Sequence, residues 1–169
     1  MASCIVSTTA LTQPVWARAQ ARFPFDFESF SARMQTLAAA PHAPVAPALP
    51  AAFQNLDYDA YRLVQYRDEA SRWRDEPHGY RLQAFHPGWL FAEPVKLFEL
   101  QAGAARSLGF SPADFRYLDT AVGAAAEGEA FPGVAGFRVN YPLNHDAAHD
   151  ELVSFLGASY FRSLGRGNI

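Results

Sequence analysis

The chain contains little cysteine and few charged residues, and both facts exclude several classes of protein. Its single cysteine, Cys4, cannot form a disulfide within the chain. Charged residues make up only 18% of the 169 residues, a fraction too low for a coiled coil or a disordered chain. The net charge of −3 gives no basic footprint for nucleic acid. No apolar run reaches the roughly 20 residues of a membrane-spanning helix, so we expect neither a nucleic-acid partner nor a transmembrane segment.

Apolar and aromatic residues are abundant instead. Hydrophobic residues make up 50% of the chain, and 14 Phe, 7 Tyr and 3 Trp are among them. A chain of this length and composition can bury the core of one ordinary domain.

The first 21 residues resemble the end of a secretory signal peptide. Met1–Trp16 is uncharged and loosely apolar, and small-x-small cleavage patterns follow at Ala17–Ala19 and Ala19–Ala21. We expect residues 1–21 to be a signal-peptide remnant of an exported protein. One element of a signal peptide is missing, since no Lys or Arg precedes the apolar part. The alternative is a disordered leader whose alanine spacing arose by chance.

A helix and a proline-rich segment are expected next. Asp26 is a suitable N-cap, and apolar residues at helical spacing predict a short amphipathic helix over Phe27–Ala39. Proline then recurs at every third residue from Pro41 to Pro50, as along one edge of a polyproline II helix. A stiff strap over the domain is favoured over a ligand for a proline-recognising module.

The rest of the chain reads as antiparallel strands. Asp119–Gly136, rich in Ala and Gly, predicts an exposed loop. Leu152–Leu164 reads as one long strand that runs into a turn at Gly165–Asn168, and such a turn expects a partner strand. We therefore expect the chain to be the front piece of a larger protein. No helices alternate with the strands, so the fold class predicted is all-β, an incomplete antiparallel β-sandwich with a short amino-terminal helix. The other expected strands are Tyr61–Arg67, Tyr80–Gly88, Val95–Leu100 and Phe137–Tyr141.

Six separated segments carry a family resemblance. They are Asn55–Tyr61, Trp73–Glu76, Phe85–Gly88, Glu93–Lys96, Ala135–Leu143 and Leu156–Arg162. In order and spacing they resemble the periplasmic glucan biosynthesis proteins of the OpgG/OpgD (MdoG/MdoD) family. The resemblance spans about Phe25 to Asn168.

The resemblance implies a periplasmic protein of osmoregulated β-1,2-glucan biosynthesis. It implies a large β-sandwich similar to the galactose mutarotase fold, of which residues 22–169 would be the amino-terminal part, followed by an immunoglobulin-like domain. Some members are β-1,2-glucanases whose acidic residues lie downstream of the segment matching Arg162, hence beyond Ile169. We therefore expect no catalytic residue and no activity in this chain by itself.

The acidic and histidine residues indicate neither a catalytic carboxyl pair nor a metal site. Glycoside hydrolysis needs two carboxyl groups across a cleft, and no spacing in the chain pairs two. Adjacent acids such as Asp150 and Glu151 point to opposite faces of a strand and read as solvated. His145 and His149 have a spacing that could suit a metal on a helix, but a surface turn is favoured because a site needs three or four ligands. No cofactor or metal is expected.

Glucan binding draws on flat aromatic faces and on polar side chains that fix hydroxyls. Tyr160 and Arg162 share one strand face and could line a groove; alternatively, Tyr160 packs in the core and Arg162 bridges a neighbouring strand. His86, at a strand end, could touch a sugar hydroxyl, although a structural, hydrogen-bonded role is favoured. The predicted substrate-binding residues are Tyr160, Arg162, Trp89 and His86, with Trp73 a further aromatic candidate.

Two functions from different classes follow. In the first, the parent protein hydrolyses or transfers β-1,2-glucan, with its acid and base outside this chain. In the second, a non-catalytic sandwich holds nascent glucan or docks on the membrane glucan synthase. Incubating the whole protein with linear β-1,2-glucan separates them, because only an enzyme shortens the chains.

Overall fold

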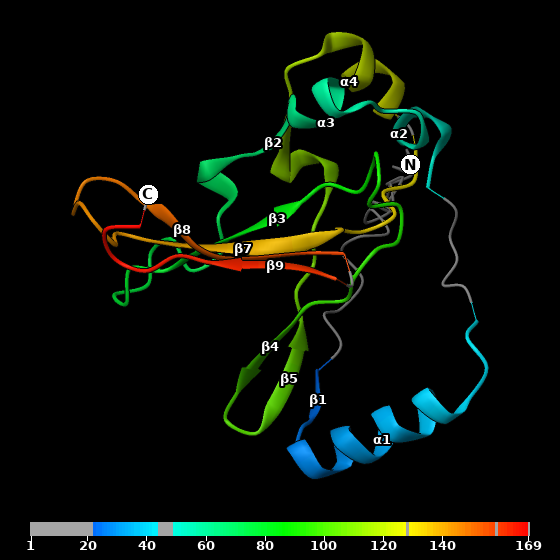
Figure 1. The fold of residues 1–169 in the computed structure, drawn as a ribbon, viewed down its shortest axis with the longest axis vertical. Coiled ribbons are helices and arrows are strands. Elements are labelled where there is room, and N and C mark those ends of the chain that lie inside the picture. The colour runs from blue at the N-terminus through cyan, green and yellow to red at the C-terminus, as the bar shows by residue number, and fades with distance from the viewer. Residues whose placement is uncertain (1–21, 44–48, 128, 158, 169) are drawn as a thin grey trace, which may run out of the picture.

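A computed structural model describes residues 22–43, 49–127, 129–157 and 159–168 (Figure 1). The signal-peptide prediction and the middle of the proline segment lie outside these residues. The strands are β1 Arg22–Pro24, β2 Val64–Tyr66, β3 Arg81–Phe85, β4 Phe98–Gln101, β5 Ala104–Ser107, β6 Phe115–Tyr117, β7 Gly136–Tyr141, β8 Asp150–Leu156 and β9 Tyr160–Ser163. The helices are α1 Phe27–Ala39, α2 Ala51–Gln54, α3 Tyr58–Arg62 and α4 Thr120–Ala126, with 3₁₀ turns η2 Asp68–Ala70 and η3 Pro112–Asp114.

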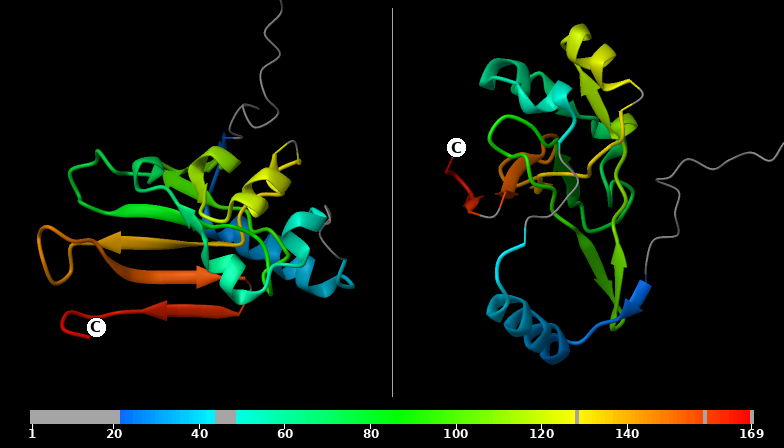
Figure 2. Two further views of the ribbon diagram at one scale, coloured as in Figure 1. Left: turned by 90° about the horizontal axis from the view of Figure 1, so that it is seen from above. Right: turned by 90° about the vertical axis from the view of Figure 1, so that its right-hand side faces the viewer.

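Every pairing between these strands is antiparallel, which confirms the predicted all-β class. The largest sheet has the order β3-β7-β8-β9, and its strands lie side by side when viewed from above (Figure 2). A three-stranded sheet, β1-β5-β4, extends away from it, and β2 pairs with β6. The small helices α2, α3 and α4 gather at the opposite end from α1 (Figure 1).

Two apolar clusters hold the sheets and helices together. One joins α2 to α4 through Phe53, which is 2% exposed, and Ala126. The other packs Tyr66 of β2 and Phe115 of β6 against Ala84 of β3. The β2–β6 pair therefore packs on one face of the large sheet, in a sandwich-like arrangement.

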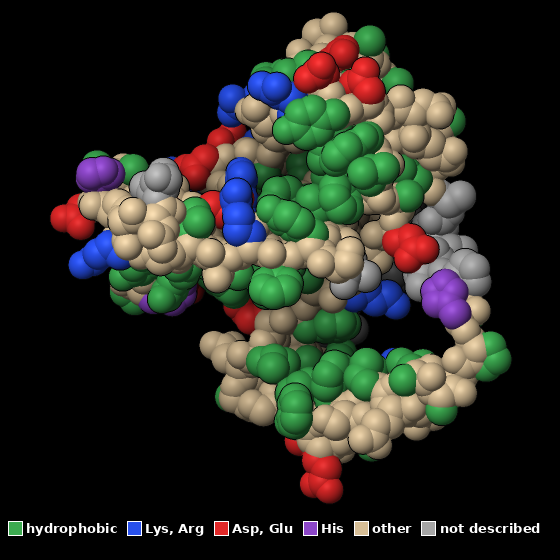
Figure 3. Space-filling view, viewed as in Figure 1, with side chains coloured by type: hydrophobic (Ala, Val, Ile, Leu, Met, Phe, Trp, Pro, Cys, Tyr) green, Lys and Arg blue, Asp and Glu red, His purple; other side chains and the backbone are tan. Residues whose placement is uncertain are grey.

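Helix α1 has the predicted bounds, and the predicted cap is confirmed. The Asp26 carboxylate accepts a hydrogen bond from the backbone N–H of Ser29 at 2.8 Å. None of the helix residues is buried, and Phe27 is 75% exposed. The apolar side of α1 faces the body of the protein across a gap (Figure 3). No helix among the residues described is both long and apolar enough to span a bilayer.

The predicted long strand Leu152–Leu164 is wrong, because the chain reverses within it. Strand β8 ends at Leu156, and β9 pairs back along it with Tyr160 opposite Leu156. Gly157 adopts φ +63°, in the left-handed region that glycine enters without a Cβ penalty. The sequence pattern continued through the turn because aromatic residues stand on both sides of it.

Two further predictions are corrected by local capping. The expected loop Asp119–Gly136 contains α4, because the Asp119 carboxylate caps an alanine-rich segment by accepting from Ala121 N–H at 2.8 Å. The expected strand Tyr61–Arg67 begins in α3 instead, and the paired strand is limited to Val64–Tyr66. Periodicity alone did not separate these short helices from a loop in the first case and from a strand in the second.

Candidate functional site

Four polar side chains follow one another across the large sheet. Gln83 of β3 lies opposite Arg138 of β7, which lies opposite Ser154 of β8, which in turn lies opposite Arg162 of β9. Side chains at paired positions point to the same face of a sheet. The Arg138 Nε–H donates to Gln83 Oε1 at 3.0 Å. We call these four residues the polar row.

Glu151 links the two arginines of the polar row. Its carboxylate lies 3.7 Å from Arg138 and forms a hydrogen-bonded ion pair with Arg162. A β-bulge makes this possible: the register shifts after Val139, so that Glu151 pairs with Asn140, which shares its face with Arg138. Glu151 reads as a solvated acid from the sequence, and this expectation is wrong, because a bulge leaves no sequence signal.

The residues at the far end of β3 form an aromatic platform. Trp89 packs against Tyr58 at 5.3 Å between ring centroids, against Phe91 at 5.8 Å and against Tyr61 at 6.0 Å. Trp89 has φ 51°, a left-handed conformation that costs a side-chain-bearing residue about 1–3 kcal/mol. Two backbone hydrogen bonds between Gly88 and Phe91, at 3.0 and 2.8 Å, hold this turn. We call Tyr58, Tyr61, Trp89 and Phe91 the aromatic platform.

A cavity of about 520 Å³ joins the platform to the polar row. Tyr58 and Tyr61 of the platform line it, together with Arg138 of the row, Gln65 and Phe85. The Arg138 guanidinium also lies over the Phe85 ring, 5.8 Å from its centroid. On this face of the molecule, apolar side chains gather below the small helices with basic side chains beside them (Figure 3).

His86 lines the same cavity and is hydrogen-bonded to the platform and to the core. Its side chain is 2% exposed, with Nδ1 2.6 Å from the Pro87 carbonyl oxygen and Nε2 3.1 Å from the Tyr117 hydroxyl. A proton on Nδ1 lets the ring donate to Pro87, and Tyr117 then donates to Nε2. Burial lowers the pKa of His86 to about 4, so the ring is neutral at pH 7. The Tyr61 hydroxyl donates to the His86 carbonyl oxygen at 2.9 Å, which fixes the platform to this core.

The structure divides the four predicted binding residues between two places. Trp89 is the centre of the platform, and His86 lines the platform cavity with both ring nitrogens hydrogen-bonded. Tyr160 and Arg162 stand on β9, two residues apart on one face, and both are exposed. Tyr160 does not pack in a core, whereas Arg162 does bridge to the neighbouring strand through Glu151. Binding of a ligand by these four residues stays a prediction.

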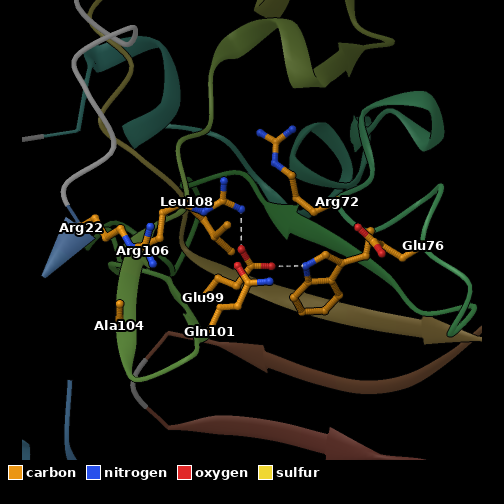
Figure 4. A pocket seen from close by; sticks show the side chains of 9 residues that line it. Arg22, Arg72, Glu76, Glu99, Gln101, Ala104, Arg106 and Leu108 are labelled. Atoms are coloured by element: carbon orange, nitrogen blue, oxygen red, sulfur yellow. Dashed lines mark hydrogen bonds and ion pairs between the residues drawn. The ribbon is translucent and has the colours of Figure 1, made fainter. Parts of the chain in front are cut away.

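A second pocket, of about 430 Å³, is lined by Trp73 together with Glu99, Gln101 and Arg106, the last three labelled in Figure 4. Trp73 has φ 62°, and its indole N–H donates to Glu99 Oε1 at 2.6 Å. The other Glu99 oxygen forms an ion pair with Arg106 on the adjacent strand. These two hydrogen bonds, Trp73 first, hold the pKa of Glu99 below its usual value. We call this the Trp73 pocket.

The expected histidine turn is confirmed. His145 and His149 lie in the turn between β7 and β8, where Asp150 instead accepts hydrogen bonds from the backbone and side-chain amides of Asn144, both at 3.0 Å. Within the described residues, no three His, Cys, Asp or Glu side chains converge as metal ligands would.

The fold and the site define an antiparallel β protein with a cavity lined by aromatic rings and a guanidinium group. Residues 25–169 match the family described as "Periplasmic glucan biosynthesis protein, MdoG". The chain belongs to this family, as its sequence resemblance predicted.

Curated relatives of the chain support this family membership. The chain is 46% identical over 148 residues to glucans biosynthesis protein G of Cereibacter sphaeroides, covering 85% of this chain and 26% of that protein. It is 35% identical to glucans biosynthesis protein G of Ralstonia nicotianae, covering 90% of this chain and 30% of that protein. Glucans biosynthesis protein D of Stenotrophomonas maltophilia is also 35% identical, with 85% of this chain and 26% of that protein covered. The chain thus spans between a quarter and a third of the length of these relatives.

Proposed function

We propose that this chain is part of a periplasmic protein of glucan biosynthesis, and that the aromatic platform and the polar row bind β-1,2-linked glucan. Family membership supports the role in glucan biosynthesis. Residues 22–169 would form the amino-terminal part of the glucan-acting sandwich. The observation that carries the binding proposal is Arg138, which lines the platform cavity and is hydrogen-bonded into the polar row.

The chemistry of the two surfaces is complementary to a sugar chain. Pyranose rings present apolar faces, which pack on flat aromatic side chains, and hydroxyl groups at their rims. Tyr58 is 57% exposed and offers such a ring at the edge of the platform. Arg138 and Arg162 can donate to hydroxyl oxygens, and Glu151 can accept from hydroxyl groups. Neutral hydroxyls suit this surface because the Glu151 carboxylate already offsets part of the charge of the two guanidinium groups.

The role of these residues is binding rather than bond cleavage. Glycoside hydrolysis needs a pair of carboxyl groups flanking the scissile bond. The two carboxylates that contact the polar row are instead bound by its own side chains, Glu151 by Arg138 and Arg162, and Asp68 by Gln83. Hydrolysis or transfer by the whole protein would use this surface to hold the substrate. A non-catalytic protein that holds nascent glucan, or docks on the membrane synthase, would use it in the same way.

Calorimetric titration of the chain with linear β-1,2-glucan tests the proposal. We expect saturable binding that Trp89→Ala weakens at least about tenfold, because the central ring of the platform is lost. Leu37→Ala, at an exposed apolar residue of α1, at the opposite end of the molecule from the small helices, is the matched control and should leave binding unchanged. Absence of binding, or equal affinity in Trp89→Ala and wild type, would refute the proposal.

A further inference from the structure

The Trp73 pocket is built by one face of the β1-β5-β4 sheet and the segment before β3. Arg22, Arg106 and Glu99 stand opposite one another across the three strands, so their side chains share a face. Gln101 lies two residues beyond Glu99 on that face. Trp73 also lines the pocket, and its indole N–H donates to Glu99, which Figure 4 labels. The cavity of about 430 Å³ lies within the range of about 300–1,000 Å³ usual for small-molecule pockets.

The indole of Trp73 is fixed without losing its flat surface. An N–H bond lies in the plane of the ring, so the hydrogen bond to Glu99 covers neither ring face. His78 contacts the indole in a T-shaped arrangement at 6.0 Å, and this contact covers one face at most. The left-handed backbone at Trp73 is costly for an aromatic residue, and such strain concentrates at functional sites.

The polar groups around Trp73 retain hydrogen-bonding capacity. An ionised carboxylate offers about four acceptor positions, and Trp73 and Arg106 occupy two of those on Glu99. A guanidinium has five N–H donors in a fixed fork, more than Glu99 can occupy on Arg106. The Gln101 amide is exposed and supplies both a donor and an acceptor. Donors and acceptors beside a flat ring suit a ligand that carries several hydroxyl groups.

The charges in the pocket balance, which favours a neutral ligand. Arg22, Arg72 and Arg106 line it together with Glu76 and Glu99. Arg72 also pairs with Asp114 at 3.4 Å, so three guanidinium groups meet three carboxylates. A phosphate or another anion would gain little from such a balanced set.

We propose that the Trp73 pocket is a second saccharide-binding site, which takes a neutral pyranose ring of a glucan. It shares no lining residue with the platform cavity. This inference rests on the proposed function in taking glucan as its ligand, but its residues are separate and can be tested separately. Gln101 is the specificity residue of the site, because its exposed amide can pair with adjacent hydroxyls.

Indole N–H resonances in ¹⁵N-labelled full chain report on the two sites in one titration. The probes are a linear β-1,2-gluco-oligosaccharide, methyl β-D-glucopyranoside and inorganic phosphate. We expect both sugars to shift the Trp73 resonance saturably, in wild type and in Trp89→Ala, and phosphate to leave it unmoved. Gln101→Ala should weaken this response about three- to tenfold through loss of one or two hydrogen bonds. Gln35→Ala, on exposed α1, is the matched control and should not change it.

The outcomes separate the two proposals. If the oligosaccharide shifts Trp89 but not Trp73, the second site is refuted and the proposed function stands. If it shifts Trp73 alone, and Trp89→Ala binds as wild type does, the platform proposal fails and the Trp73 site stands. A Trp73 shift with phosphate but not with sugar would overturn the saccharide assignment, as would equal sugar affinity in Gln101→Ala and wild type. If neither resonance moves, both proposals fail.

Discussion

At the scale of a single residue, burial gives His86 a structural role. Its ring packs against Phe53 at 4.5 Å in a tilted arrangement and edge-on against Phe115 at 5.0 Å, and its two nitrogens bond to Pro87 and Tyr117. The sequence placed His86 at a strand end, where a sugar contact and a structural role were both open. It could not show the aromatic residues, distant in the chain, that surround the ring.

The lowered pKa of His86 gives the stability of the fold a pH dependence. The pKa is about 4 in the folded protein and 6.5 in an unperturbed histidine. Between these values the unfolded chain binds a proton that the folded chain does not, so stability is fully present above pH 6.5 and is lost as the pH falls. We expect the free energy of unfolding to drop by about 2 kcal/mol between pH 7 and pH 5. Urea unfolding at each pH measures it.

Histidine variants isolate this effect. His78→Gln, at an exposed ring, should keep the same drop between pH 7 and pH 5. His86→Gln should be less stable at pH 7 but should lose most of the pH dependence. An unchanged pH dependence in His86→Gln would show that other groups cause it.

Glu151 is a second residue whose role depends on its neighbours. Its side chain is 19% exposed and faces both Arg138 and Arg162. Glu151→Gln should lower the free energy of unfolding by about 1 kcal/mol. The loss is small because Arg162 is half exposed and solvent screens its ion pair with Glu151. Glu93→Gln, at an exposed acid, should stay within about 0.5 kcal/mol of wild type. Chemical denaturation of the three proteins makes the comparison, and equal losses in the two variants would contradict the bridging role.

At the scale of elements, the sequence predicted helices and strands that depend on local signals but not features that depend on strand pairing. Helix α1 was predicted to the residue because its cap and its apolar spacing are both local. Strands β3 and β7 followed from clean alternation. The hairpin between β8 and β9 and the bulge beside Val139 depend on how strands pair, so the polar row could not be assembled from the sequence.

The close approach of β8 to β7 leaves no room for a side chain at Gly136. A Cβ at this position would lie 2.1 Å from the carbonyl oxygen of Phe155 and 2.8 Å from the Cα of Leu156. Both are backbone atoms, so neither can move without breaking the strand pairing. We expect Gly136→Ala to cost about 3 kcal/mol or more of stability, measured by thermal unfolding.

Gly165 provides the comparison for this substitution. A Cβ there would meet only the side chain of Asn168, at 3.5 Å, an ordinary contact. Gly165→Ala should therefore unfold within about 0.5 kcal/mol of wild type. If both alanine variants were equally stable, the close approach at Gly136 would be wrong.

The whole molecule exposes a ladder of phenylalanine rings on the large sheet. Phe137 stacks on Phe155 at 5.1 Å, and Phe155 on Phe161 at 6.3 Å. Phe155 is 42% exposed and Phe161 72%. Contiguous apolar surface of this kind binds hydrophobic dyes. We expect the folded chain to enhance the fluorescence of anilinonaphthalene sulfonate, and Phe161→Ser to reduce that signal.

An isolated apolar residue serves as the control for the ladder. Leu118 is 47% exposed but lies outside the ladder, so Leu118→Ser should leave dye binding nearly unchanged. Equal reductions in the two variants would mean that the dye does not bind at the ladder.

The account as a whole depends on Arg138, which ties the platform cavity to the polar row. The most direct measurement is the dissociation constant of linear β-1,2-glucan for wild type, Arg138→Ala and Arg33→Ala, the last at an exposed position on α1. We predict that Arg138→Ala raises the dissociation constant at least about tenfold while Arg33→Ala leaves it unchanged. Indistinguishable constants for all three proteins would contradict a glucan site at this surface.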